Sequence, residues 1–257
     1  GYMRRYLIYI SMLEFLKNKL RDFYFKRRFY IVENNKKIFS IRKFGGATSG
    51  RGKNFFDKEP ETVKWINSFN KNSNFLDIGA NVGIYSLYAA SKDINVVSFE
   101  PESSNYYQLN LNIIDNNFTN RIKAYPFSAG KNFELGNLDL GTLKVGGSGH
   151  NFLSKKENSF DERGLFSQGS IGFSIDYYIE LSNFIPNFIK IDVDGNEALV
   201  VEGMKNTLKN NELKSILLEV NHKFDSHIKA MEIIKNNNFE IVKKEKYDFL
   251  TNYIFSR

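Results

Sequence analysis

The chain has 257 residues, of which 42% are hydrophobic and 25% charged, and this size and composition fit one large α/β domain with an N-terminal extension. It contains no cysteine, which excludes disulfides and thiolate metal sites. The formal net charge is +7, but eight basic and two acidic residues place +6 of it between residues 1 and 31. Because the remainder is nearly neutral, a nucleic-acid channel across the main domain is not expected.

The first segment, residues 3–28, is predicted to form one or two basic amphipathic helices. Apolar residues recur there at steps of three and four, with lysines and arginines between them. Such a helix suits an anionic membrane surface, and it equally suits docking on the domain or on a second subunit. No apolar run approaches the ~20 residues of a membrane span. We therefore expect a cytoplasmic protein, with peripheral contact at the inner membrane face as the alternative.

The next segment is expected to lead into the main domain. Residues 29–41 contain two short strands with a turn between them, which predicts a hairpin. The Gly-rich, basic stretch 45–54 predicts a mobile loop, and Glu59-Pro60 predicts the start of a helix. We therefore divide the chain into an N-terminal part, 1–58, and a main domain, 59–257.

Residues 75–85 indicate a strand, a tight loop and the start of a helix. The spacing D-x-G-x-N-x-G, from Asp77 through Gly79 and Asn81 to Gly83, matches neither the dinucleotide nor the P-loop fingerprint. The glycines allow positive φ or close backbone approach to a ligand. Because the carboxylate of Asp77 would repel a pyrophosphate, the loop favours a ligand with a cationic amino acid end, S-adenosylmethionine (SAM). An ordinary strand-to-helix turn is the alternative.

The next predicted strand ends in a second carboxylate, Glu100, followed by Pro101 at the start of a helix. Glu100 lies about 20 residues beyond the glycine loop, where an acid can accept hydrogen bonds from both ribose hydroxyls. NAD-binding folds share this feature. It therefore indicates a ligand with a nucleoside but does not distinguish SAM from NAD. A third strand leads to Ser128 and Ala129, whose backbone is a candidate contact for an adenine edge; a simple turn is the alternative.

Residues 135–173 form a long irregular segment with a possible hairpin, and we predict that it is a lid or binding loop. Disorder is the alternative, although the phenylalanines of the segment argue against it. His150 follows a Gly-rich run in this segment, and it is the best candidate for a general base. A merely solvated loop histidine is the alternative.

The second half of the chain supplies further acids at strand ends. Lys190, Asp192 and Asp194 alternate along the fourth strand and so share one side of it. A lysine in a central strand is costly unless paired, so we expect Lys190 to pair with a neighbouring carboxylate. The fifth strand ends near Glu219 and Asn221. Together with Asp192 and Asp194 these hard oxygen donors form a candidate Mg²⁺ or Ca²⁺ site, with a structural role as the alternative.

Strands and helices alternate along the chain with short links, which predicts a doubly wound, mostly parallel sheet. The last two strands, near 240–242 and 250–255, are so close in sequence that one is expected to be antiparallel. Ligands of such sheets bind at the carboxyl ends of the strands. The acids described above are therefore expected to converge on one site.

Four segments together resemble the FkbM family of SAM-dependent methyltransferases: D-I-G-A-N-V-G at 77–83, F-E-P at 99–101, I-K-I-D-V-D-G-N-E at 189–197 and L-E-V at 218–220. The resemblance covers the chain from about residue 59 onward. The family's usual K-I-D-V-E-G-A-E is mildly changed here, at Asp194 and Asn196. The resemblance implies a class I methyltransferase fold, which is Rossmann-like with a seven-stranded sheet, and SAM as methyl donor with S-adenosylhomocysteine (SAH) as product.

The resemblance also implies O-methylation of a hydroxyl, often in polysaccharide or glycolipid modification or in natural-product tailoring. A sugar hydroxyl is a weak nucleophile that gains from a general base or a metal. His150, Asp192 and His222 are the candidate bases, and Lys190 is expected to act beside Asp192. The acceptor is accordingly expected to be a carbohydrate or a small molecule with a hydroxyl group.

The sequence is compatible with four functions. Two are O-methyltransferases, one for a sugar and one for a small natural product. The pI of 9.2 suggests an RNA methyltransferase, but the charge is concentrated at one end and the N-methylation signature [DN]-P-P-[YF] is absent. A non-catalytic SAM-binding scaffold is the fourth. The participation of a metal stays open.

Overall fold

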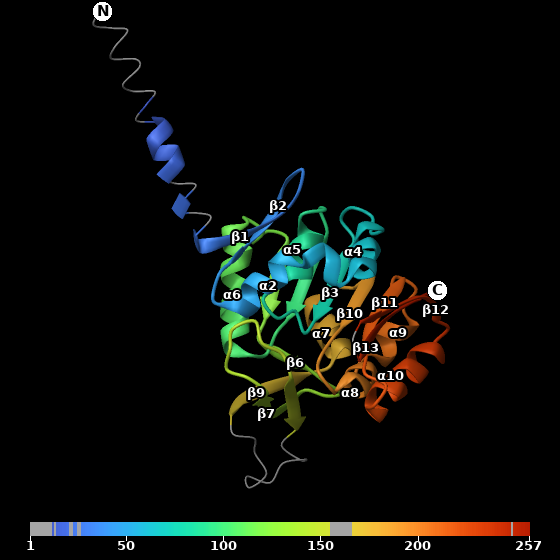
Figure 1. The fold of residues 1–257 in the computed structure, drawn as a ribbon. Coiled ribbons are helices and arrows are strands. Elements are labelled where there is room, and N and C mark those ends of the chain that lie inside the picture. Colours follow the sequence, from blue (N-terminus) through green and yellow to red (C-terminus); the bar gives the residue numbers. More distant parts are fainter. Residues whose placement is uncertain (1–11, 13, 21–22, 25–26, 155–165, 248) are drawn as a thin grey trace, which may run out of the picture.

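The structure is a computed structural model that describes residues 12, 14–20, 23–24, 27–154, 166–247 and 249–257 (Figure 1). At its centre lies a seven-stranded sheet, in which β13 runs antiparallel to both of its neighbours and the other strands are parallel. The predicted fold class is confirmed. In spatial order the strands are β12 (Glu240–Tyr247), β13 (Leu250–Ser256), β11 (Ser215–Val220), β10 (Phe188–Ile191), β3 (Asn74–Ile78), β4 (Asn95–Phe99) and β5 (Ile122–Tyr125).

Helices cover both faces of this sheet, so its central strands are buried on both sides (Figure 1). Successive strand residues point to opposite faces. Phe75 packs with the cluster that contains α4, α5 and α6, whereas Leu76 packs with the cluster that contains α7 to α10. The helices are α4 (Pro60–Asn67), α5 (Ile84–Ala90), α6 (Ser103–Asp115), α7 (Ile175–Ser182), α8 (Glu197–Glu202), α9 (Lys205–Lys209) and α10 (Asp225–Lys235).

The predicted hairpin is present as β1 (Phe29–Asn34) and β2 (Lys36–Arg42), which pair antiparallel. The predicted helix start at Glu59-Pro60 is also confirmed, with the proline in the first turn of α4. Phe39 of β2 belongs to the same buried cluster as α5. The segment before residue 59 therefore contributes to the core of the main domain.

The prediction of a mobile loop at 45–54 is wrong, because residues Gly46–Lys53 form helix α2, followed by α3 (Phe55–Lys58). Glycines make this helix weak on its own. Tertiary packing stabilises it: a Cβ on Gly52 would come within 2.4 Å of the Tyr30 ring, and Thr48 is fully buried. The small side chains that suggested a loop are what lets α2 lie against β1.

A second, four-stranded sheet occupies much of the segment predicted to be a lid. The predicted hairpin is formed by β7 and β8, which pair antiparallel, and residues 155–165 lie outside the described residues. In Figure 1 this sheet lies beyond one end of the central sheet. In spatial order its strands are β6 (Phe127–Ala129), β9 (Ser167–Phe173), β7 (Glu134–Leu140) and β8 (His150–Ser154).

The described residues between 12 and 28 are helical and extend away from the domain (Figure 1). The apolar side chains Phe15, Leu16 and Leu20 are exposed there. The rest of the helix predicted for residues 3–28 lies outside the described part of the chain. Within the described part, no helix combines the length and hydrophobicity that crossing a membrane requires.

Candidate active site

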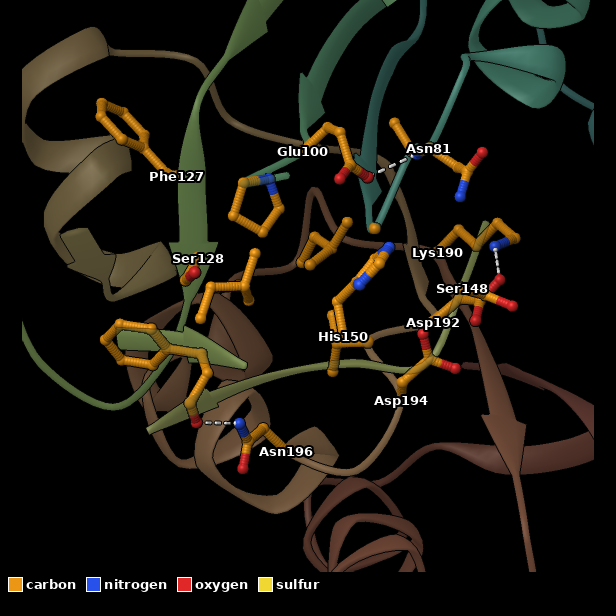
Figure 2. A pocket seen from close by; sticks show the side chains of 18 of the residues that line it. Asn81, Glu100, Phe127, Ser128, Ser148, His150, Lys190, Asp192, Asp194 and Asn196 are labelled. Atoms are coloured by element: carbon orange, nitrogen blue, oxygen red, sulfur yellow. Dashed lines mark hydrogen bonds and ion pairs between the residues drawn. The ribbon is translucent and has the colours of Figure 1, made fainter. Parts of the chain in front are cut away.

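A cavity of about 750 Å³, its open mouth included, lies at the carboxyl ends of the central parallel strands. Ligands of open α/β sheets bind at this edge of the sheet. The lining of the cavity brings together most of the predicted site residues and draws on the central sheet, the small sheet and α2 (Figure 2). The predicted residues in the lining are Gly79, Asn81, Glu100, Pro101, Ser128, Ala129, His150, Lys190, Asp192 and Asp194.

The loop after β3 forms part of the cavity wall because its glycines allow two close approaches. Gly79 has φ +80°, and a Cβ there would lie 1.8 Å from the backbone oxygen of Asp192. Gly83 has φ +88° and caps α5, where a Cβ would lie 2.3 Å from Leu109. Gly83 itself is not in the cavity lining. It therefore shapes the loop, while Gly79 and Asn81 face the ligand space.

Asp77 lies behind the cavity, not in its lining. The side chain is 1% exposed, and its Oδ2 accepts a hydrogen bond of 2.5 Å from Ser86. Burial raises the pKa of Asp77, and the charge of Lys190 opposes this effect. Asp77 can therefore act on a ligand only indirectly, through its effect on Lys190 and on the loop. The sequence had predicted direct contact between Asp77 and the ligand. Residue alternation along β3 turns its side chain toward α5.

Glu100 lies at the end of β4 and is 4% exposed. Its two oxygens accept hydrogen bonds from the backbone nitrogens of Asn81 at 2.7 Å and Glu102 at 3.0 Å (Figure 2). Burial raises the pKa of Glu100 to about 7, although both backbone bonds and the charge of Arg51 favour the ionised form. A carboxylate has about four acceptor positions, so two remain for a pair of ligand hydroxyls.

The wall near the end of β6 is largely apolar. Ser128 and Ala129 lie in the lining there, with Phe127, Leu138 and Phe152 around them. Ser128 Oγ lies 2.9 Å from Ser170 Oγ, so its hydroxyl is held by the small sheet. A flat aromatic ligand group suits such a wall. The sequence indicated Ser128 and Ala129, but it missed the three apolar residues.

Lys190 forms the expected ion pair. Its Nζ lies 2.6 Å from Asp192 Oδ2 while its side chain is 2% exposed (Figure 2). Burial alone would raise the pKa of Asp192, but the charge and hydrogen bond of Lys190 more than offset it and hold the pKa below its usual value. The Lys190 ammonium also lies 5.2 Å from the centre of the Tyr85 ring. The charge of Lys190 is therefore compensated within the protein.

The candidate metal set is only partly assembled. Oxygens of Asp192, Asp194 and Glu219 lie within 4.8 Å of one another, whereas the Asn221 amide oxygen accepts a hydrogen bond from the Lys223 backbone. Burial, with the charge of Asp192, raises the pKa of Glu219 to about 9. Tyr247 donates a hydrogen bond to Glu219. Lys190 already binds one oxygen of Asp192, which makes this cluster a poorer site for a cation.

His150 is the histidine that lines the cavity. The side chain is buried, and neither ring nitrogen makes a hydrogen bond of good geometry with a described residue, although the nearby backbone of Gly147 raises the pKa of the imidazole. Burial lowers the pKa of His150, although Glu102 and Asp194 oppose this effect. His222, predicted as another base, is exposed and outside the lining, where its Nε2 lies 3.1 Å from the Tyr253 hydroxyl. A neutral imidazole whose nitrogens are shielded from solvent thus borders the ligand space.

The loop that carries His150 is hydrogen-bonded to the central domain on both sides. Gly147 O accepts a bond of 2.6 Å from Asn81 Nδ2, and Gly149 N donates one of 2.7 Å to Asp194. Asn196 Nδ2 donates to Asn151 Oδ1 at 2.7 Å and to Phe152 O. Asn196 was not predicted as a site residue, although its departure from the family pattern was a signal. Residues 146–152 therefore form a roof over the cavity.

These residues fit SAM. Glu100 offers acceptors for a ribose diol, the apolar wall near Ser128 suits the adenine, and the carboxylates of Asp192 and Asp194 suit a cationic ammonium or sulfonium. The buried His150 ring leaves one polar group bordering the remaining space. The same residues would not suit a pyrophosphate, because the charged groups nearest the loop are mainly acidic.

Residues 77–241 match the family described as the methyltransferase FkbM domain. Among solved structures, fibrillarin of Aeropyrum pernix with natively bound SAM is 9% identical over 88% of this chain and 82% of its own, with a TM-score of 0.51. Precorrin-6y C5,15-methyltransferase of Geobacter metallireducens is 12% identical over 77% and 86%, with a TM-score of 0.47. At such identities the likeness shows the fold alone. No curated protein sequence matches this chain.

Proposed function

This chain belongs to the FkbM methyltransferase family, and on that premise we propose that it transfers a methyl group from SAM to a hydroxyl oxygen of a sugar, in a surface polysaccharide or glycolipid precursor. The observation that carries the proposal is the buried imidazole of His150 in the lining of the cavity. A hydroxyl needs a base to become a good nucleophile, whereas a nitrogen acceptor with a free lone pair does not. The sugar class follows from the family resemblance.

SAM, when bound, supplies a methyl group already activated on a sulfonium. The residues of this chain therefore chiefly align the acceptor oxygen and remove its proton. His150, kept neutral because burial lowers its pKa, accepts that proton at a ring nitrogen as the new carbon–oxygen bond forms. Asp194 stabilises the resulting imidazolium, and the roof covers part of the cavity.

The test uses SAM with a labelled methyl group, screened against activated sugars and cell-surface glycans. His150→Gln keeps a polar side chain of similar reach but cannot act as a base at neutral pH. We expect it to lower kcat by about 10²- to 10⁴-fold while SAM affinity, measured by calorimetry, stays the same. Full activity of His150→Gln would remove His150 as the base. An inactive wild-type protein that still binds SAM would favour the scaffold function.

The exposed apolar side chains of the N-terminal helix support a lipid-linked acceptor. Phe15, Leu16 and Leu20 are exposed beside Lys17 and Lys19, a combination that suits an anionic membrane surface. In liposome flotation, the full chain should float with vesicles that contain anionic lipid, and Leu16→Glu should not. A full chain that does not float would remove membrane contact and leave a soluble sugar or small natural product as the acceptor, and equal flotation of both proteins would remove the role of the apolar face.

A further inference from the structure

Arg51 brings a cation to the cavity from outside residues 77–241, the region that matches the family. It lies in the last turn of α2 and is half-buried. Its Nε donates a hydrogen bond of 3.0 Å to Gly146 O in the roof. Within the described chain, its two Nη groups make no hydrogen bond or ion pair. The guanidinium is thus anchored at one nitrogen and offers the other two to a ligand.

The position of Arg51 is fixed by close packing on both sides of α2. A Cβ on Gly52 would come within 2.4 Å of the Tyr30 ring, so α2 lies directly against β1. On the other side, a Cβ on Gly146 would lie 3.1 Å from Thr48. A planar guanidinium held in this way is preorganised for a planar two-oxygen anion, because little rotational freedom is lost on binding.

The other charged residues of the cavity indicate the charge of the ligand group that would bind Arg51. Glu100, Asp192 and Asp194 are acidic, and Lys190 is already paired with Asp192 at 2.6 Å. Such a lining favours cations and repels a carboxylate. A ligand with both kinds of charge can therefore place its anionic group well only beside Arg51.

Resting on the function proposed above, we propose that Arg51 binds the α-carboxylate of SAM. The amino acid end of SAM has one carboxylate and one ammonium, and the cavity offers Arg51 for the first and aspartates for the second. Arginine and carboxylate form paired, charge-assisted hydrogen bonds through two nitrogens and two oxygens. A carboxylate or phosphate on the acceptor would present the same chemistry, so the experiment must separate the two sources.

Calorimetry with SAM and with decarboxylated SAM, which lacks the carboxylate but keeps the ammonium, separates them. We expect Arg51→Met to lower the affinity for SAM by about 10- to 100-fold. The same variant should change the affinity for decarboxylated SAM by less than about twofold, because the bond it removes is absent there. Arg51→Lys keeps the charge and should recover part of the loss. Lys53→Met is the matched control, because Lys53 is an exposed cation on the same turn.

Three results would overturn the proposal. Unchanged SAM affinity in Arg51→Met would show that the guanidinium serves something else, and a raised KM for an acidic acceptor would then identify the acceptor as the source of the anion. Equal losses for SAM and decarboxylated SAM would show that Arg51 only supports the roof. A wild-type protein that binds neither compound would remove the SAM site itself, and this proposal with it.

Discussion

The floor and the roof of the cavity are built in different ways. The floor is the loop after β3 together with Glu100, Lys190 and Asp192 at the strand ends, and its positions follow from the register of a buried sheet. The roof is residues 146–152, and its position follows from hydrogen bonds that Arg51, Asn81 and Asp194 make to its backbone. The floor can thus hold the residues that bind the cofactor in constant positions. The roof can change in sequence and so change which acceptor enters the cavity.

The largest change in stability is expected when the charge pair in the floor is removed. Lys190→Met leaves the buried carboxylate of Asp77 and the half-buried carboxylate of Asp192 without their cation, so we expect the free energy of unfolding to fall by about 3–5 kcal/mol. Urea denaturation measures it. Lys71→Met is the control: Lys71 also pairs with an aspartate, Asp93, but on the surface, and its loss should change little. Similar stabilities of the two variants would contradict a floor held by a buried charge pair.

The next effect concerns SAM binding at the floor. Because the pKa of Glu100 is about 7, we expect SAM affinity to rise as pH increases from 6 to 8 and the carboxylate ionises. Glu100→Gln should lower SAM affinity by about 10-fold or more at pH 8 and remove this pH dependence. Calorimetry across the pH range measures both. A wild-type affinity that does not vary with pH would show that Glu100 does not meet the ligand as a carboxylate.

Glu100 should have the opposite effect on the stability of the free protein. Its pKa is higher in the folded chain, at about 7, than the ordinary value of 4.5. Its contribution to stability is therefore fully present below pH 4.5 and is lost as pH rises through 7. Without SAM, the free energy of unfolding should fall more with rising pH in wild type than in Glu100→Gln. The two proteins should show the same pH dependence if the carboxyl is solvated.

A smaller effect is expected at the roof. Asn196→Ala removes two hydrogen bonds to the strand that follows His150, and each such bond contributes about 1 kcal/mol. We expect faster hydrogen exchange in residues 146–152 and a severalfold loss of affinity for SAM, with little change in global stability. Protection that stays at the wild-type level would show that the roof does not depend on Asn196.

The smallest expected effect is that of EDTA. Lys190 binds Asp192, and Tyr247 donates to Glu219, so the acidic cluster has partners of its own. Methyl transfer should therefore be unchanged after dialysis against EDTA. A loss of activity that Mg²⁺ or Ca²⁺ restores would contradict the prediction that no metal takes part.

The contrast between floor and roof also describes what could be predicted from the sequence. The strand ends at Glu100 and Asp192 follow from hydrophobic pattern and spacing, and the Lys190 pair follows from the cost of a buried charge. The face of β3 on which Asp77 lies depends on three-dimensional packing, so its place behind the cavity could not be predicted. Helix α2, and with it Arg51, depends on contacts with Tyr30 that no local pattern contains.

The atom that receives the methyl group distinguishes an O-methyltransferase from the alternatives. Wild-type protein is incubated with SAM carrying a ¹³C-methyl group and with a panel of glycans, and the product is examined by NMR. The account predicts a methyl carbon bonded to a sugar oxygen, formed by wild type and strongly reduced in His150→Gln. A methyl group found on nitrogen or carbon, or formed equally fast by His150→Gln, would contradict it.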